Sequence, residues 1–291
     1  MKSKLASTYL LFGMAVSAAM LAVSSASAQN LFVANWYNPG AVYNITPGGS
    51  ISTFNSGELG EPIGLAFDHS GNLFVADSYD GSIDEITSGG VQSTFASGLG
   101  DIHALAFNSS GDLFAAGFGS GDIYEFTPGG VGSVFASGLG TPTGLAFNSS
   151  GDLFVANNGG GEIYEFTPGG ARNTFASGLN SPSDLAFNSA GNLFMGGPST
   201  ILEFTPNGGQ STFAATGASG LAFNSSGDLF AADGQNLLEI TPGGSVSTFA
   251  TGLGNATGVA IQGETLPVPE PSTMVLSLVG GAAVLLRRQR K

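Results

Sequence analysis

Few residues in this sequence have side chains that could do chemistry. The chain of 291 residues has two histidines, one tryptophan and no cysteine, so disulfides, thiolate metal sites and cysteine nucleophiles are excluded. The sequence also contains no Gly-x-Ser-x-Gly nucleophile motif and no phosphate-binding loop. The remaining candidates are His103 and Asp184, an imidazole and a carboxylate that could move a proton or bind a polar ligand.

Both residues stand where a repeated pattern is broken, and that pattern predicts the elements that position them. Twenty of the 22 phenylalanines fall in four recurring columns whose period is close to 40 residues. The columns belong to segments of the types Gly-Leu-Ala-Phe, Leu-Phe-Val-Ala, Ile-Tyr-Glu-Phe-Thr-Pro-Gly-Gly and Ser-Thr-Phe-Ala. Such a period indicates one structural unit used repeatedly.

Each unit contains four short apolar runs, separated by turns of the Asn-Ser-Ser-Gly-Asp and Thr-Pro-Gly-Gly types. Runs this short, rich in Phe, Ile, Val and Thr, favour strands over helices. Four strands in about 40 residues are typical of a β-propeller blade, whereas a solenoid would have shorter repeats with fewer strands. The sequence therefore predicts an all-β fold, a six-bladed β-propeller with four-stranded antiparallel blades.

The phase of the repeat predicts how the ring closes. The repeats begin at the second strand of a unit, Asn30 to Ala34, and end with an unpaired first strand, Gly258 to Ile261. We expect these N- and C-terminal strands to pair with each other, because the ring then has no exposed edge.

The first residues of the first strands should form a ring at the mouth of the central channel. In one column His103 interrupts a series of mostly hydroxyl residues, and in the next column Asp184 interrupts a series of mostly glycines. Two readings stay open: a binding site at the channel mouth, or repeat positions that have drifted and are solvated at a rim.

Loops between the second and third strands should lie on the same face. They contribute Trp36, Asp77 and Asp233, and an aromatic ring beside carboxylates suits stacking on sugars. The predicted ligand-binding set is therefore His103, Asp184, Trp36, Asp77 and Asp233, with the alternative that the aromatics only cover a blade. We assign no catalytic residue, no metal ligand and no cofactor, and a divalent cation in the channel is left open without support. The acids Asp77, Asp80 and Asp84 lack the 12-residue EF-hand spacing and its closing Glu.

Charge excludes one class of partner. The net charge is −14, and between the two ends of the chain Arg172 is the only Lys or Arg, against twenty acidic residues. Such a surface repels phosphate backbones. We therefore predict no binding to nucleic acid.

The N-terminal segment, residues 1–28, is typical of a signal peptide. Lys2 and Lys4 precede an apolar stretch, and Ala26-Ser27-Ala28 supplies a small-x-small cleavage pattern. We expect a signal helix that is cleaved on export; the alternative is a membrane anchor.

The C-terminal segment, residues 267–291, has three parts: Pro269-Glu270-Pro271, an apolar run from Met274 to Leu286, and a tail that starts at Arg287. Thirteen apolar residues are fewer than the 17–25 or so that span a bilayer. The arrangement resembles the PEP-CTERM sorting signal of Gram-negative bacteria. That resemblance implies a short hydrophobic sorting helix, transient membrane association through it, and recognition by an exosortase-type membrane protease that removes the tail. A plain C-terminal anchor is the alternative.

The repeat of residues 142–157 and its copies resembles the propellers of the NHL and SMP-30/gluconolactonase/streptogramin lyase group. The resemblance covers roughly residues 30–262, within a predicted propeller domain of residues 29–266. It implies that enzymes of this group use a channel metal or a catalytic His. In this chain the ring supplies one His and one Asp without a cluster of carboxylate ligands.

Two functional classes follow. The first is a secreted, non-catalytic binding or scaffold module of the cell envelope, cell surface or extracellular polysaccharide matrix, with polysaccharide or another envelope protein as its partner. The second is a lyase or lactone hydrolase acting at the central channel. The regularity of the repeats favours binding, because catalysis requires departures confined to particular blades.

Overall fold

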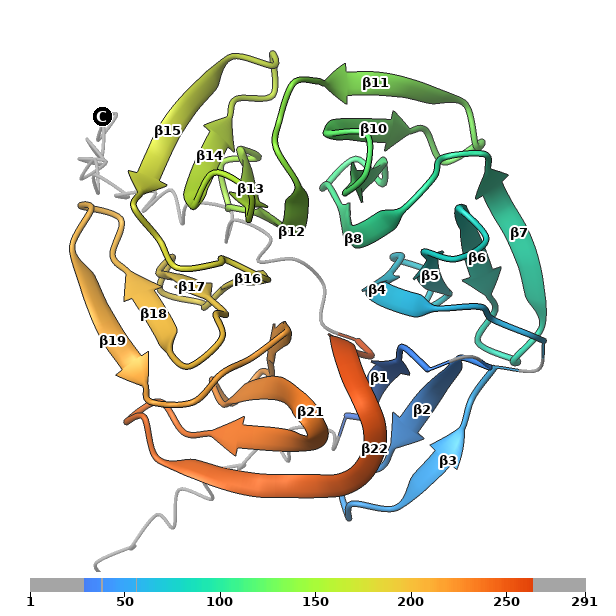
Figure 1. The fold of residues 1–291 in the computed structure, drawn as a ribbon. Coiled ribbons are helices and arrows are strands. Elements are labelled where there is room, and N and C mark those ends of the chain that lie inside the picture. The colour runs from blue at the N-terminus through green and yellow to red at the C-terminus, as the bar shows by residue number, and fades with distance from the viewer. Residues whose placement is uncertain (1–28, 38, 56, 264–291) are drawn as a thin grey trace, which may run out of the picture.

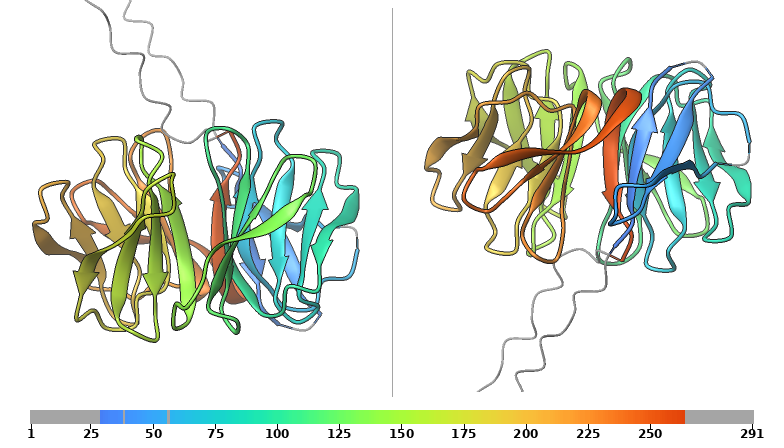
Figure 2. Two further views of the ribbon diagram at one scale, coloured as in Figure 1. Left: turned by 90° about the horizontal axis from the view of Figure 1, so that it is seen from above. Right: turned by 90° about the horizontal axis from the view of Figure 1, so that it is seen from below.

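The computed structural model describes residues 29–37, 39–55 and 57–263, and in this part of the chain it contains 22 strands and no helix. The strands form sheets arranged radially around a central channel (Figure 1), and side views show a short, wide disc (Figure 2). The predicted signal helix and sorting helix lie outside the described residues. No helix in the described part could cross a membrane.

Four of the sheets have the predicted four-stranded antiparallel form. Their members, in chain order, are β4 (Pro62–Phe67), β5 (Leu73–Asp77), β6 (Ser82–Ile86) and β7 (Gln92–Ser97); β8 (Ile102–Phe107), β9 (Leu113–Gly117), β10 (Asp122–Phe126) and β11 (Gly132–Ala136); β12 (Pro142–Phe147), β13 (Leu153–Asn157), β14 (Glu162–Phe166) and β15 (Arg172–Ser177); and β16 (Leu185–Phe187), β17 (Leu193–Met195), β18 (Ile201–Phe204) and β19 (Gln210–Ala214).

The fifth sheet corrects the predicted number of blades. It has six strands in the order β20-β21-β22-β1-β2-β3. Counted as continuous hydrogen-bonded sheets, the propeller has five blades, so the prediction of six separate four-stranded blades is wrong. The strands of this sheet are β20 (Gly220–Phe223), β21 (Leu229–Ile240), β22 (Val246–Ile261), β1 (Leu31–Asn35), β2 (Ala41–Ile45) and β3 (Ile51–Thr53).

Two long strands are the reason for the difference. The last repeat has a short connection, Asp233-Gly234-Gln235-Asn236, where the other repeats have longer turns. Through this connection Gly234 pairs with Ala256 and Asn236 pairs with Thr251. β21 and β22 therefore stay hydrogen-bonded where a loop was expected, and the first and last repeats share one sheet.

The predicted closure of the ring is confirmed. β1 and β22 pair antiparallel, with Leu31 opposite Ile261 and Val33 opposite Val259. The blue and red ends of the ribbon accordingly lie side by side in Figure 1. A backbone bond from the Gln262 N–H to the Asn30 carbonyl, at 3.1 Å, extends the pairing by one step.

The phenylalanine columns hold neighbouring blades together. Phe74 packs edge to face against Phe95 of its own blade and against Phe107 of the next, with both pairs of ring centroids 5.0 Å apart. Similar pairs recur around the ring around Phe32, Phe114, Phe154 and Phe194. Buried aromatic contacts of this kind stabilise the core beyond simple area burial, which explains why phenylalanine recurs at these positions in nearly every repeat; the last first strand ends in Ile261 instead.

The first strands run closely past one another around the channel. A side chain at Gly144 would place its Cβ 2.7 Å from the Cα of Asp184 in the next blade. This close approach explains the glycine column, and it makes the aspartate in that column an exception. Ser181, three residues earlier, is the only described non-glycine residue with a left-handed φ, at 46°.

Candidate functional site

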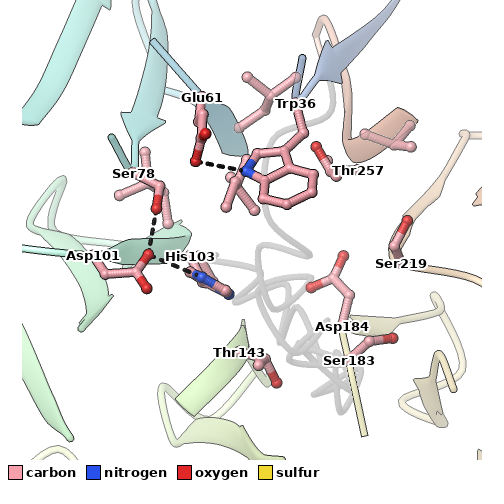
Figure 3. A pocket seen from close by; sticks show the side chains of 17 residues that line it. Trp36, Glu61, Ser78, Asp101, His103, Thr143, Ser183, Asp184, Ser219 and Thr257 are labelled. Carbon is pink, nitrogen blue, oxygen red and sulfur yellow. Dashed lines mark hydrogen bonds and ion pairs between the residues drawn. The ribbon is translucent and has the colours of Figure 1, made fainter. Parts of the chain in front are cut away.

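A cavity of about 350 Å³ lies at the end of the channel where the first strands begin, an end that we call the upper mouth. A second cavity, of about 440 Å³, lies at the opposite end, the lower mouth. Trp36, His103 and Asp184 point into the upper cavity from three different blades (Figure 3). Its polar lining is completed by Glu61, Ser78, Asp101, Thr143, Ser183, Ser219 and Thr257.

The hydroxyl ring of this cavity joins consecutive repeats. The Thr143 hydroxyl donates to the Pro182 carbonyl at 2.9 Å, and the Ser183 hydroxyl donates to the Ala218 carbonyl at 2.6 Å. Ser219 and Thr257 bond in the same way to the Ala256 and Pro62 carbonyls. These hydroxyl protons are therefore used for structure, and only the oxygen lone pairs remain to accept from a ligand.

Asp184 also bridges two repeats. Its Oδ2 accepts a 2.8 Å hydrogen bond from the Leu221 backbone N–H of the next sheet. Burial in the channel wall raises the pKa of Asp184 from 3.8 to about 7, because desolvation outweighs the backbone hydrogen bonds from Leu221 and Leu185. The carboxyl group can thus gain or lose a proton near neutral pH.

His103 is held on two sides. Its Nε2 lies 3.0 Å from Oδ1 of Asp101, and its ring stacks on Phe118 with the centroids 4.1 Å apart. Burial lowers the pKa of His103, and Asp101 opposes this effect only partly. The Ser78 hydroxyl also donates to Oδ1 of Asp101. The aspartate therefore lies between the serine and the histidine, so this trio is not a catalytic triad, in which the histidine stands in the middle.

Trp36 presents an aromatic surface at the cavity edge. It follows β1 directly, and 43% of its surface is exposed. Its Nε1–H donates to Oε2 of Glu61 at 3.1 Å, which fixes the indole while leaving ring surface at the cavity (Figure 3). Two further exposed aromatics, Tyr37 and Tyr79, lie in the loops after β1 and β5.

The structure does not bring the other two predicted residues into this cavity. Asp77 is 1% exposed, and its carboxylate accepts the Gly60 and Glu61 backbone N–H groups at 2.6 and 3.0 Å. Asn157 makes the same pair of bonds in its own blade, so Asp77 occupies a position that shapes the loop between blades. Asp233 is exposed and lines a separate, shallow pocket on the same face.

Glu61, Ser78 and Asp101 are lining residues that the sequence analysis missed. Two of them could have been found from the sequence. Glu61 and Asp101 are acidic at a repeat position where later repeats have the hydroxyl residues Thr141 and Ser181. The role of Asp77 could also have been found, because Asn35, Asp77 and Asn157 end equivalent strands. A side chain that recurs at the same position of several repeats is more simply explained by a structural role in the blade than by a binding site.

The comparisons with known proteins bear first on the C-terminus. Residues 267–291 match the family model described as the PEP-CTERM protein-sorting motif. The chain ends in a PEP-CTERM sorting motif. The predicted resemblance to this sorting signal, with Pro269, Glu270 and Pro271 as its motif, is therefore confirmed; the motif indicates export, processing by a membrane exosortase, and sorting to the cell surface or envelope.

Solved structures resemble the propeller. The nidogen/laminin complex contains a chain with a TM-score of 0.72 and 18% identity, covering 80% of this chain and 98% of that one. A gluconolactonase from Xanthomonas campestris has a TM-score of 0.64 and 15% identity, covering 68% and 78%. A streptogramin B lyase has a TM-score of 0.56 and 17% identity, covering 76% and 74%. At these identities the similarity shows the fold, and the predicted resemblance to lyase and gluconolactonase propellers holds at that level. No curated protein sequence matches the chain.

Proposed function

We propose that this protein is a non-catalytic binding module of the cell envelope or extracellular polysaccharide matrix, and that its ligand occupies the upper cavity. The observation that carries the proposal is the juxtaposition of Trp36, His103 and Asp184 around one cavity. Its volume of about 350 Å³ lies within the range of small-ligand sites. A half-exposed indole beside hydrogen-bonding groups is an arrangement that suits sugar rings.

The hydrogen bonds of the cavity favour binding over turnover. Ser78 and His103 both bond to Asp101 and not to each other, so the imidazole does not activate the serine hydroxyl. The threonine and serine hydroxyls of the ring donate to backbone carbonyls. Among the described residues no group of three or more His, Asp or Glu side chains could hold a metal ion.

A second candidate function is a lyase or lactone hydrolase. One observation favours it: Asp184, with its pKa near 7, lines the same cavity as His103, whose pKa is lowered. A carboxyl group that exchanges a proton near neutral pH, in one cavity with an imidazole whose neutral form is favoured by burial, could serve as acid and base. Structural neighbours include a gluconolactonase and a streptogramin B lyase.

A binding and turnover screen separates the two candidates. The purified protein is mixed with envelope and matrix polysaccharides, and separately with a panel of lactones and streptogramins whose cleavage is followed by mass spectrometry. We expect polysaccharide binding that the double variant His103→Ala/Asp184→Ala loses, and no cleavage. Cleavage that disappears in the same variant would establish the second candidate instead.

A matched control tests the location. Ser149→Ala/Ser150→Ala changes two exposed residues in the turn between β12 and β13, at the lower end of those strands. This control should bind as the unaltered protein does. Loss of binding in the control, together with full binding in the His103→Ala/Asp184→Ala variant, would move the site to the lower face.

The sorting part of the proposal has its own test. We expect exosortase cleavage near Pro269-Glu270-Pro271, so that the exported protein lacks the basic tail from Arg287 to Lys291. Mass spectrometry of the protein from the envelope measures this directly. Replacing all three residues of the motif by alanine should leave the tail in place, and a tail that is intact in the unaltered exported protein would contradict processing.

A further inference from the structure

The upper cavity has a charge pattern that restricts its ligand further. Three carboxylic acids line it, Glu61, Asp101 and Asp184, and His103 is the only basic side chain among its lining residues. The single Lys or Arg of the described part, Arg172, lies in β15 with its guanidinium 5.0 Å from the Tyr164 ring centroid. It is not among the residues that line the cavity, so no lysine or arginine offsets the acids there.

The three acids are not equally satisfied. Asp101 faces His103 and the Ser78 hydroxyl, and Glu61 accepts from the Trp36 indole. Asp184 has only backbone N–H partners, from Leu221 and Leu185. Its pKa is raised because its environment removes water without supplying a positive charge. A cation entering the cavity would supply that charge and favour the ionised carboxylate.

Trp36 adds a second feature that favours a cation. Its N–H edge is turned to Glu61, and its ring extends toward the same space as the Asp184 carboxyl group (Figure 3). The face of an indole attracts a positive charge more strongly than the face of any other side chain. An aromatic face and a carboxyl group without a positively charged partner, around one cavity, form a combination that neutral sugars do not require.

We infer that the ligand of the upper cavity carries a positively charged amino group, as an amino sugar with a free amine does. This inference rests on the proposed binding function and names the chemical class of its ligand. The amino group would lie over the exposed face of the Trp36 ring, on the side toward the Asp184 carboxylate. The sugar hydroxyls would donate to the free lone pairs of the Ser and Thr oxygens at the channel mouth.

The test compares two oligosaccharides with one backbone. Isothermal titration calorimetry measures the binding of a glucosamine tetramer, with its amines protonated, and of the same tetramer with every amine acetylated. We expect the amino form to bind at least about tenfold more tightly than the acetylated form. Asp184→Asn and Trp36→Ala should each weaken binding of the amino form about tenfold.

Matched controls separate the cavity from the general negative charge of the protein. Asp80→Asn removes one carboxylate from an exposed position in the loop between β5 and β6, outside the cavity. Tyr79→Ala removes an exposed aromatic from the same loop. Both variants should bind the amino tetramer as the unaltered protein does. Equal weakening by Asp80→Asn and Asp184→Asn would mean that only the overall charge attracts the ligand, and it would overturn the inference.

The outcomes distinguish this inference from the function on which it rests. If the acetylated tetramer binds as tightly as the amino form, and Trp36→Ala weakens both, the cavity binds sugars but the requirement for positive charge is wrong. If neither tetramer binds while another polysaccharide does so through His103 and Asp184, the inference fails and the proposed function stands. If no glycan binds, both fail.

Discussion

The two mouths of the channel are built from the same first strands, and yet they differ in chemistry. Each first strand starts at the upper mouth and ends at the lower one. The upper cavity is lined by three acids, a histidine, a tryptophan and several hydroxyls. The lower cavity is lined mainly by Leu, Ala and Phe, among them Phe67 and Phe107.

The two mouths differ in how much the amino-acid sequence varies from one repeat to the next. At the lower mouth the same Ala-Phe pair ends one strand after another, as at Phe107, Phe147 and Phe187. These rings pack between blades, so a change there would cost stability. At the upper mouth the side chains bridge neighbouring repeats through single hydrogen bonds, which several residue types can make. The upper end can therefore depart from the repeat, and a site that is specific for one ligand needs such departures.

The largest expected effect comes from removing the strand that both mouths share. Deleting residues 256–262 takes away the part of β22 that pairs with β1. The deletion exposes unpaired backbone groups and opens the ring. We expect insoluble protein, measured as the soluble fraction after expression and by thermal unfolding. A soluble truncation that unfolds cooperatively would show that closure is dispensable and that the mouths do not depend on it.

A smaller effect separates the two mouths. Phe107→Ala removes a ring that is 7% exposed and packs edge to face on Phe74. We expect a loss of about 3 kcal/mol in the free energy of unfolding, measured by urea denaturation. His103→Ala at the upper mouth should cost less, about 1 kcal/mol, because it removes one hydrogen bond to Asp101 and the stacking on Phe118 at a partly exposed position. Equal losses at both mouths would contradict the view that only the lower one is committed to packing.

The smallest effect concerns pH and a single carboxyl group. Folding raises the pKa of Asp184 from 3.8 to about 7. Between these two pH values the carboxyl group is protonated in the folded protein and ionised in the unfolded chain. The Asp184 contribution to stability is therefore greatest below pH 4 or so, is lost as the pH rises toward 7, and stays lost above it. Asp184→Asn keeps an oxygen acceptor for the Leu221 N–H and removes this penalty.

We therefore expect Asp184→Asn to match the unaltered protein at about pH 4 and to be more stable at about pH 8. The gain should be about 1–2 kcal/mol, because some contact with channel water reduces the penalty. Thermal unfolding of both proteins across this range measures it. All other titratable groups are the same in the two proteins, so the difference between the two curves isolates Asp184. A constant difference across the range would mean that Asp184 does not change its charge.

Much of this fold was predictable because packing is repetitive. The phenylalanine columns indicated strands and radial blades, since each blade must present the same rings to its neighbour. The phase of the repeat indicated ring closure. The sheet count failed at Asp233–Asn236, where a short connection lets Gly234 pair with Ala256. Continuous pairing across two repeats depends on a contact between β21 and β22. The period of the sequence predicts the strands but not whether the two strands stay paired beyond the blade.

The site was predictable only in part, for a related reason. His103, Asp184 and Trp36 could be found as departures from the repeat or as an isolated aromatic residue. The roles of Asp77 and Asp101 depend on which backbone or side-chain groups form hydrogen bonds with their carboxylates in the folded protein. Asp77 accepts two N–H groups in the loop before its own blade, and Asp101 bonds to Ser78 of the preceding blade. Such partners are set by the curvature of the ring, which the linear sequence does not state.

The position of Ile261, at the lower end of β22, also determines which way the molecule faces. Gly263 lines the lower cavity, and the sorting motif begins at residue 267. The C-terminal segment therefore leaves the propeller at the lower face. If a membrane holds the protein by that segment, the upper cavity lies on the face away from the point of attachment.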